Sequence, residues 1–303
     1  MKLGLVGLGK MGANMVQRLR RDHHQVVVWD LDAGQMATVS GETGAVPAAD
    51  LDDLCRRLAG PRIVWVMLPA GRPTELTLEK LSERLQEGDV VLDGGNSLYK
   101  DTLIRAGMLA RKGIQLLDVG TSGGIWGLEE GYCLMVGGSK EAFQQVEPIL
   151  KTLAPPLGYA RVGPVGAGHY TKMIHNGIEY ALMQGYAEGF EILKEGPFPL
   201  DLPGVAKLWG KGSVIRSWLL DLVASALEKN PDLAGIQAWV ADSGEGRWTV
   251  EEAMERSVAA PAITQALFAR FASRRHDAFS LRLVAALRHE FGGHGTQSGG
   301  EKG

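Results

Sequence analysis

The sequence contains very little cysteine. Its 303 residues include two, Cys55 and Cys133, which is too few for the disulfide framework of a small secreted protein. Cys55 falls in a helical segment and Cys133 in a strand-like run, so we expect both thiols to be buried. The chain also lacks any cluster of cysteines and histidines at metal-ligand spacing, and we therefore expect no metal site.

An excess of positive charge is missing as well. The formal net charge is -3 and the isoelectric point is about 6.2. The chain therefore has no electrostatic footprint for nucleic acid or for an anionic membrane surface, and we expect neither as a partner. An acidic ligand would have to be held by a few well-placed cations.

Long hydrophobic runs are also absent. No uninterrupted apolar stretch is long enough to span a bilayer. The first residues, MKLGLVGLGKMG, begin directly with a strand pattern and leave no room for a signal peptide. We expect a soluble cytoplasmic protein that has no membrane partner.

The first half of the chain does contain an alternation of strand and helix patterns. Short runs rich in Val, Ile and Leu are separated by segments of helical periodicity, such as residues 15–21 and 74–85. This alternation implies right-handed βαβ units, and hence an α/β, Rossmann-type, doubly wound and mainly parallel sheet. The expected strands cover residues 2–7, 25–30, 62–68, 89–95, 114–120 and 132–138.

From about Gly166 the pattern changes to helices alone. We place the boundary in VGPVGAG, residues 162–168, and predict an α/β domain over residues 1–164. An all-α domain is expected over 165–294, and a disordered tail over 295–303. The expected helices cover residues 167–195, 203–210, 213–228, 249–258, 262–274 and 279–289.

A glycine motif lies at the first turn of the expected sheet. Gly7, Gly9 and Gly12 form GxGxxG between a strand and a helix, and Asp30 ends the next strand, 18 residues beyond Gly12. In such a motif the first glycine allows the turn, the second admits a pyrophosphate and the third permits close packing. Asp30 would accept hydrogen bonds from the adenosine ribose. The pattern predicts a dinucleotide site, with a tight but empty turn as the alternative.

The residues after Asp30 bear on the choice of cofactor. Leu31 and Asp32 follow it, so no cation is at hand to neutralise a 2′-phosphate, and two carboxylates would repel one. We therefore predict NAD as the cofactor, with NADP possible but disfavoured. A nicotinamide cofactor implies hydride transfer and leaves the substrate open.

A polar stripe runs along the first long helix of the second half. Lys172, His175, Asn176 and Glu179 are spaced i, i+3, i+4 and i+7, so they share one face. A partly exposed amphipathic helix is the plain alternative. The flanking residues are largely apolar, however, and burial would disfavour the charged form of Lys172, as a general base requires. The stripe is therefore a candidate catalytic site.

Five motifs occur in order along nearly the whole chain. They are GLGKMG (7–12), DGGNS (93–97), TSGG (121–124), GAGHYTKMIHNGIEY (166–180) and RHEFGGH (288–294). Together they resemble the decarboxylating 6-phosphogluconate dehydrogenases, within the β-hydroxyacid dehydrogenase superfamily. The chain is similar to the short, bacterial-type form of that family, because the helical part of the long form is larger.

The resemblance implies an oxidative decarboxylation of 6-phosphogluconate to ribulose 5-phosphate and CO2. Lys172 would be the general base for the C3 hydroxyl, Glu179 the acid that protonates C1, and Asn176 a further catalytic group. The other implied cofactor positions are Leu8, Lys10, Met11, Leu68, Pro69, Ala70 and Asn96, beside the three glycines and Asp30. The implied substrate positions are Asn96, Ser122, Gly123, Gly124, His175, Asn176, Tyr180, Arg270, Arg288 and His294.

The implied phosphate site involves a second subunit. Tyr180, Arg270, Arg288 and His294 match family positions that bind the phosphate, and arginine suits a dianion. In the family the last two come from the neighbouring subunit's tail. The resemblance therefore implies a homodimer or homotetramer in which the C-terminal tail completes the neighbour's site. It also implies a NAD-binding domain over residues 1–164 and a substrate and dimerisation domain over 165–294.

The sequence departs from the long form at this phosphate site. Where the long form has K-G-T-G-K-W, this chain has Ser243-Gly-Glu245-Gly-Arg247-Trp. Ser243 removes a cation, and Glu245 would repel phosphate unless it turns away or pairs with Arg247. Pro69 also replaces a lysine of the cofactor loop, which again suits NAD.

Two other functions are compatible with parts of the pattern. A dehydrogenase of a non-phosphorylated β-hydroxyacid, of the 3-hydroxyisobutyrate or gluconate type, would share the Rossmann half, TSGG and the lysine. It would not need Glu179 or the phosphate clamp. A catalytically silent NAD-binding scaffold is the other alternative, against which Lys172, Asn176 and Glu179 argue.

Overall fold

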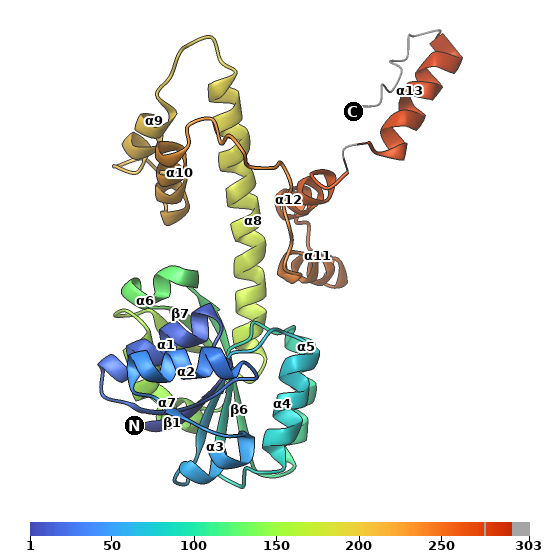
Figure 1. The fold of residues 1–303 in the computed structure, drawn as a ribbon. Coiled ribbons are helices and arrows are strands. Elements are labelled where there is room, and N and C mark those ends of the chain that lie inside the picture. Colours follow the sequence, from blue (N-terminus) through green and yellow to red (C-terminus); the bar gives the residue numbers. More distant parts are fainter. Residues whose placement is uncertain (276, 293–303) are drawn as a thin grey trace. The chain divides into compact units, whose positions relative to one another are not determined.

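The computed structural model describes residues 1–275 and 277–292. The chain divides into two compact units, the first over Met1–Asn176 and the second from Gly177 onward. The division falls inside one long helix, α8 (Ala167–Lys194), and not in a loop (Figure 1). This one helix therefore contributes residues to both units.

The first unit, in which every residue is described, is built on an eight-stranded sheet in the order β3-β2-β1-β4-β5-β6-β7-β8. Strands β6 and β7 pair antiparallel, and all other neighbours pair parallel. The predicted doubly wound, mainly parallel sheet is thus confirmed. The strands are β1 (Lys2–Val6), β2 (Gln25–Trp29), β3 (Val46–Pro47), β4 (Ile63–Val66), β5 (Val90–Asp93), β6 (Gln115–Ser122), β7 (Cys133–Gly137) and β8 (Tyr159–Gly163).

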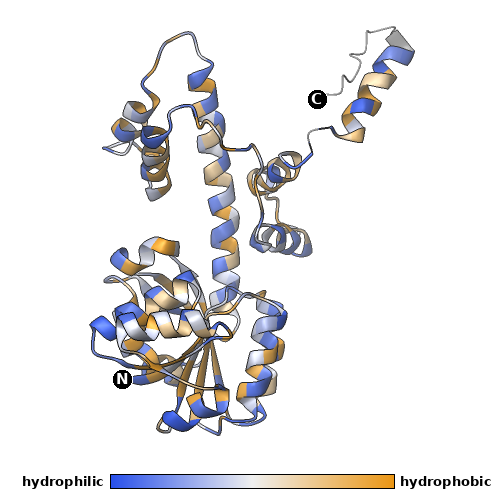
Figure 2. Ribbon diagram, viewed as in Figure 1, coloured by the Kyte–Doolittle hydropathy of each residue, from blue (hydrophilic) through white to orange (hydrophobic). Residues whose placement is uncertain are grey.

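Helices cover both faces of this sheet. They are α1 (Lys10–Arg21), α2 (Ala33–Thr43), α3 (Leu51–Arg57), α4 (Arg72–Ser82), α5 (Tyr99–Ala110), α6 (Gly127–Glu130) and α7 (Lys140–Leu153). Successive strand residues point to opposite faces: Leu5 and Val28 pack with α1, α2 and α7, whereas Val6 and Val27 pack with α3, α4 and α5. Because both faces are covered at the middle of the sheet, the inner strands β1, β4 and β5 are largely buried and hydrophobic, as the orange strands in Figure 2 show.

The second unit is helical in its described residues. Besides the end of α8 it contains α9 (Leu202–Trp209), α10 (Trp218–Lys229), α11 (Glu245–Glu255), α12 (Pro261–Ala272) and α13 (Phe279–Gly292). Two small cores hold it together. Phe190 of α8 packs with Leu220 of α10, and Tyr180 of α8 packs with Leu267 of α12. None of the described helices is long and apolar enough to cross a membrane.

Several sequence expectations need correction. Strands β3 and β8 were not predicted, because β3 has two residues and three of the five residues of β8 are exposed. Helix α10 begins at Trp218 and not at 213, since Ser217 caps it by accepting from the Leu220 N–H. Cys55 is buried as expected, but Cys133 is exposed, since it begins β7.

Candidate functional site

The three glycines of the turn between β1 and α1 have different surroundings. Gly7 has φ +95°, and a Cβ there would lie 2.4 Å from the Met67 carbonyl oxygen. A Cβ on Gly12 would lie 2.0 Å from the Gly7 carbonyl oxygen, whereas one on Gly9 would meet no atom within 4 Å in the part of the chain that the structure describes. Packing inside the protein therefore requires glycine at 7 and 12, while Gly9 borders open space.

The start of α1 fits an anionic group in that space. Gly9 provides no side-chain cap, and the first turn of α1 has no acidic residue. The unpaired N–H groups of the first helical turn and the positive end of the helix dipole lie there together. Lys10 is exposed and Met11 partly buried in the same turn. This arrangement suits the pyrophosphate of a dinucleotide.

Asp30 is fixed beside this turn by backbone donors. Its Oδ2 accepts from the Leu8 N–H at 2.5 Å and its Oδ1 from the Asp32 N–H at 2.8 Å. The side chain of Leu8 is fully buried, and its carbonyl accepts from Gln35. Each carboxylate oxygen of Asp30 keeps a lone pair for a further donor such as a ribose hydroxyl. Leu31 is 89% exposed and adds no charge.

The segment after β4 lies beside the same turn. The side chain of Leu68 is partly buried and would lie 2.9 Å from a Cβ on Gly7. Pro69 and Ala70 are exposed, and the Pro69 carbonyl accepts from the Thr74 hydroxyl at 2.9 Å. The predicted cofactor loop is therefore anchored at its start and exposed beyond it.

Asn96 joins the DGGNS and TSGG segments to each other. Its Nδ2 donates to the Thr121 carbonyl at 3.1 Å, and its Oδ1 accepts from the Thr121 N–H at 2.9 Å. Ser122 is partly buried, while Gly123 and Gly124 have φ of +133° and +53°. One amide hydrogen of Asn96 is left for a ligand, so its side chain mainly ties two loops together.

Lys172 lies near the start of α8 and is 5% exposed. Its Nζ is 3.5 Å from His175 Nδ1, which in turn is 3.0 Å from Asn176 Oδ1. A single ring nitrogen either donates or accepts, so these two contacts depend on the tautomer. The predicted polar stripe thus begins with a buried lysine beside polar partners, which suits a general base.

In the second unit Tyr180 brings three side chains together. Its ring is buried, and the Arg270 guanidinium lies 3.5 Å from the ring centroid. Arg270 also donates to the Ala241 carbonyl at 2.8 Å. The Tyr180 hydroxyl lies 3.4 Å from Ser243 Oγ and accepts from the Ser243 N–H at 3.3 Å. A phenol, a guanidinium and a hydroxyl are thus gathered in one place.

Asp242 holds two arginines next to this group. Arg247 donates to both carboxylate oxygens, at 2.7 and 3.1 Å, and Arg274 donates to Oδ2 at 2.5 Å. The hydrogen bonds from Arg247 and then Arg274 lower the pKa of the Asp242 carboxyl to about 2, against an opposing effect of burial. Because two guanidinium groups share one carboxylate, the group of three side chains has a net positive charge. Arg247 and Arg274 also line a cavity of about 790 Å³.

Glu245 neither pairs with Arg247 nor is exposed. It lies in the first turn of α11 and is 9% exposed, and its Oε2 has no hydrogen-bond partner among the described residues. Arg247 pairs with Asp242 because that carboxylate can accept from both of its donor atoms. Of the two possibilities left open by the sequence, pairing between Glu245 and Arg247 is therefore wrong.

The remaining predicted positions are more scattered. Glu179 is partly buried on α8, seven residues or about two turns after Lys172. Arg288 is exposed on α13. His294 lies outside the described residues, so the predicted contribution of the tail stays a prediction.

Two buried polar residues were missed by the sequence reasoning. Asp118 is fully buried in β6, and His169 is 1% exposed in the first turn of α8. The Asp118 carboxylate accepts from the N–H groups of Gly166 and His169. A carboxylate inside an apolar strand run is a signal that could have found it, because such a group needs buried donors.

The parts of the site define a class of protein. A doubly wound sheet whose first turn admits a dinucleotide, followed by a helix with a buried lysine, is typical of dinucleotide-dependent dehydrogenases. Residues 2–165 match the model for the NAD binding domain of 6-phosphogluconate dehydrogenase, and residues 168–289 match that for its C-terminal domain. The chain belongs to the 6-phosphogluconate dehydrogenase family.

Individual relatives support this family assignment. An NAD(+)-dependent, decarboxylating 6-phosphogluconate dehydrogenase of Haloferax volcanii is 46% identical over 97% of this chain and 98% of its own. The structure of Plasmodium falciparum 6-phosphogluconate dehydrogenase superposes with a TM-score of 0.84 at 27% identity, over 100% of this chain and 67% of that one. A 3-hydroxyisobutyrate dehydrogenase of Mycobacterium tuberculosis, at 19% identity and TM-score 0.73, covers 95% of this chain and 99% of its own and shows the shared fold alone.

Proposed function

We propose that this protein oxidises and decarboxylates 6-phosphogluconate to ribulose 5-phosphate and CO2, with NAD as the hydride acceptor. The observation that carries the proposal is the buried Lys172 with His175 and Asn176 beside it, in a chain of this family. The Haloferax volcanii relative, which aligns over nearly its whole length, has this activity in its name.

Lys172 and Glu179 divide the proton transfers. Neutral Lys172 accepts the proton of the C3 hydroxyl, and NAD, when bound, accepts the hydride from C3. Protonated Lys172 then donates to the new C3 carbonyl, which takes up the electrons released when the carboxylate leaves as CO2. Glu179 protonates the carbon that becomes C1 of the product, while Lys172 takes the enediol hydroxyl proton. Asn176 and His175 orient the hydroxyls.

Three other segments supply binding groups. The turn Gly7–Gly12 would hold the pyrophosphate, and Asp30 the adenosine ribose. Because Leu31 is exposed and uncharged and Asp32 caps α2 with its carboxylate, a 2′-phosphate would find repulsion there, and NAD is preferred. Ser122 and its two following glycines would hold the substrate carboxylate.

The phosphate would bind at the Tyr180 group. The Arg270 guanidinium and the Tyr180 and Ser243 hydroxyls can all donate to phosphate oxygens. The lysine of the long form is absent, but the net positive charge of Arg247, Arg274 and Asp242 together would attract the phosphate. The buried Glu245 opposes it, so phosphate affinity rests on the arginines.

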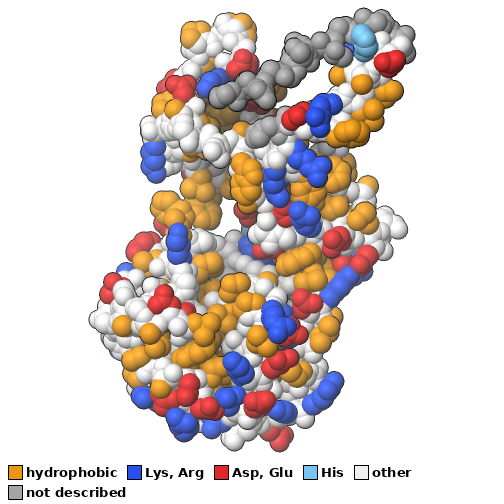
Figure 3. All heavy atoms as spheres, turned by 45° about the vertical axis from the view of Figure 1, so that its right-hand side comes forward, with side chains coloured by type: hydrophobic (Ala, Val, Ile, Leu, Met, Phe, Trp, Pro, Cys, Tyr) orange, Lys and Arg blue, Asp and Glu red, His pale blue; other side chains and the backbone are white. Residues whose placement is uncertain are grey.

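We also propose a homo-oligomer, in which the tail with Arg288 and His294 completes the neighbour's site. Helix α13 exposes Phe279, Leu283 and Leu287, and hydrophobic side chains gather on it in Figure 3. An apolar helix face of this kind is typical of a subunit contact. We propose that the partner is a small-molecule phosphorylated sugar acid. We also propose that the protein acts in the cytoplasm, in the pentose phosphate pathway and gluconate utilisation.

A steady-state assay that crosses 6-phosphogluconate and gluconate with NAD and NADP tests the function. We expect NADH formation and CO2 release with 6-phosphogluconate and NAD, and a kcat/KM on gluconate lower by at least about 100-fold, because the phosphate contacts are lost. Equal rates on both substrates would favour a non-phosphorylated β-hydroxyacid dehydrogenase. NAD binding without turnover of either sugar acid would favour a silent scaffold.

A further inference from the structure

We propose that His169 is a positioning residue for Lys172: its imidazole fixes the rotation of α8 about its own axis. The inference rests on the proposed role of Lys172 as the general base. All the contacts that carry it lie inside the first unit.

The start of α8 is held on β6 by Asp118. The carboxylate of this fully buried residue accepts from the Gly166 N–H at 2.6 Å and from the His169 N–H at 2.8 Å. An anionic acceptor at the positive end of a helix is favourable and satisfies donors that the helix itself leaves unpaired. Both contacts lie at the end of the helix, so they fix its starting point more firmly than its rotation.

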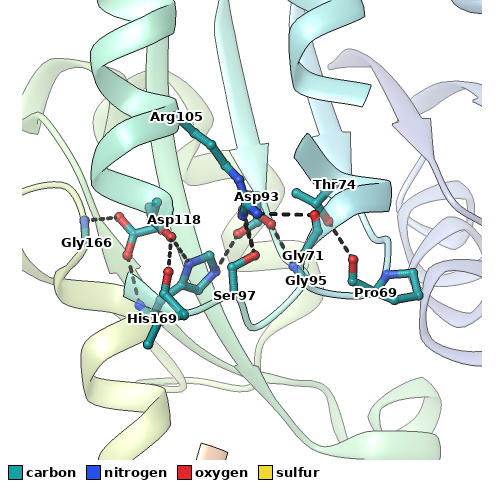
Figure 4. A network of polar contacts seen from close by, with 12 residues as sticks. Pro69, Gly71, Thr74, Asp93, Gly95, Ser97, Arg105, Asp118, Gly166 and His169 are labelled. Atoms are coloured by element: carbon teal, nitrogen blue, oxygen red, sulfur yellow. Dashed lines mark hydrogen bonds and ion pairs between the residues drawn. The ribbon is translucent and has the colours of Figure 1, made fainter. Parts of the chain in front are cut away.

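The His169 ring supplies contacts away from the axis. Its Nε2 lies 3.0 Å from the Asp93 carbonyl oxygen, and its Nδ1 lies 2.8 Å from the Thr102 hydroxyl. A carbonyl can only accept, so Nε2 carries a proton, and in the neutral ring Nδ1 then accepts from Thr102. The Thr102 hydroxyl has one proton, and its 2.8 Å contact with Nδ1 is shorter than its 3.3 Å contact with the Leu98 carbonyl oxygen. The ring therefore links α8 to β5 through Asp93, as Figure 4 shows, and to α5 through Thr102.

Asp93, whose carbonyl His169 contacts, is held in place by its own side-chain hydrogen bonds. The Asp93 carboxylate accepts from the Gly95 N–H at 3.0 Å and from the Ser97 hydroxyl at 3.1 Å. Arg105, which is also buried, lies 3.4 Å from it and donates to Ser97 at 2.9 Å. The reference point for the helix is thus the rigid end of β5, from which the DGGNS segment starts.

Close packing fixes the height of the helix above the sheet. A Cβ on Gly120 would lie 2.5 Å from the Lys172 Cβ, and one on Gly168 would lie 2.3 Å from the Asp118 carbonyl oxygen. Backbone therefore lies directly on backbone here. These glycines have no side chains that could interlock, however, so the contacts do not prevent the helix from rotating about its axis.

Small rotations would matter for catalysis. Lys172 follows His169 by three residues and shares its side of the helix. The ammonium of an extended lysine lies roughly 8 Å from the helix axis, so a rotation of about 10° moves it by about 1.4 Å. A misplacement of about 1 Å at a reacting group costs about 100-fold in rate.

The test compares His169→Leu with a matched control, His24→Leu. His24 is also a buried histidine of the first unit, and its Nε2 lies 2.9 Å from the Thr152 hydroxyl. Both variants should lower the midpoint of thermal unfolding. For His169→Leu we expect kcat with 6-phosphogluconate and NAD to fall by about 30-fold, with KM and the Kd of NAD within about threefold of wild type. For His24→Leu kcat should stay unchanged.

Two milder variants separate the contacts if His169→Leu does not fold. His169→Gln can still donate to the Asp93 carbonyl and should recover most of kcat, whereas Thr102→Val should lower kcat and lower the unfolding midpoint less than His169→Leu does. A folded His169→Leu with wild-type kcat, or an equal loss of kcat in His24→Leu, would overturn the inference. Absence of wild-type turnover would instead overturn the proposed function, so the two failures are distinguishable.

Discussion

At the scale of single residues, the burial of Lys172 is the feature on which activity depends. We expect Lys172→Met to abolish turnover, with a loss of about 1,000-fold or more, because methionine fills the space but cannot take a proton. NAD affinity should stay within about threefold, since the cofactor segments lie on other elements. Stopped-flow NADH formation and a fluorescence titration with NADH measure the two quantities. Parallel loss of cofactor binding and turnover would show that Lys172 is structural.

The ion pairs of Asp242 lead to a second prediction at this scale, which concerns the pH dependence of folding stability. Its folded pKa of about 2 lies below the ordinary value of 3.8, so its ion pairs stabilise the fold above about pH 4 and are lost as the pH falls through 2. Asp242→Asn should therefore cost about 1 kcal/mol near neutral pH, a value discounted for solvent screening. Unfolding in urea, followed by tryptophan fluorescence, measures it. A wild-type advantage that does not shrink toward pH 2 would contradict the assignment.

At the scale of elements, two glycines of the turn between β1 and α1 have different roles, one in packing and the other in ligand binding. Gly12→Ala should destabilise the protein by about 1–3 kcal/mol or more, because its Cβ would overlap the Gly7 carbonyl. Gly9→Ala should leave the unfolding midpoint nearly unchanged, since its Cβ meets nothing, yet weaken NAD binding by about tenfold or more. Thermal unfolding and NADH titration of both variants measure this. Unchanged NAD affinity in Gly9→Ala would remove the turn from the cofactor site.

Elements were also what the sequence predicted best. The buried strands of a doubly wound sheet are continuous apolar runs, so six of them could be located, and α8 was predicted within one residue at its C-terminal end. The two strands that were missed, β3 and β8, lack such runs. The Ser217 cap marks where α10 begins, and apolar periodicity does not report it. Helix α11 begins at Glu245 and not at 249, after Gly244, which offers no side-chain cap.

The candidate site was less predictable for a physical reason. Motif spacing located Lys172 and the glycine turn, because those constraints act within one segment. The contacts of His169 with Asp93 and Thr102 join segments that lie far apart in the sequence. Arg247 pairs with Asp242 although Glu245 is nearer to it in the sequence. Only the folded chain shows which partner each polar group has.

At the scale of the whole molecule, the exposed apolar face of α13 predicts assembly. Phe279, Leu283 and Leu287 recur every four residues and so share one face. Replacing all three with serine should convert an oligomer to a monomer in sedimentation velocity and raise the KM for 6-phosphogluconate by about tenfold or more, with the Kd of NAD unchanged. The control is Leu281→Ser, which is about as exposed as Phe279 but lies on another side of the helix.

Deleting the chain from Arg288 onward tests what the tail adds to that assembly. If the neighbour's Arg288 and His294 hold the phosphate, the truncated protein should stay oligomeric through Phe279 and Leu283 while its KM for 6-phosphogluconate rises by about tenfold or more. Its KM for gluconate should change little, because that substrate has no phosphate to lose contacts. A truncated oligomer with a wild-type KM for 6-phosphogluconate would exclude the tail from the site, and the phosphate would then depend on Tyr180 and Arg270 of the same chain.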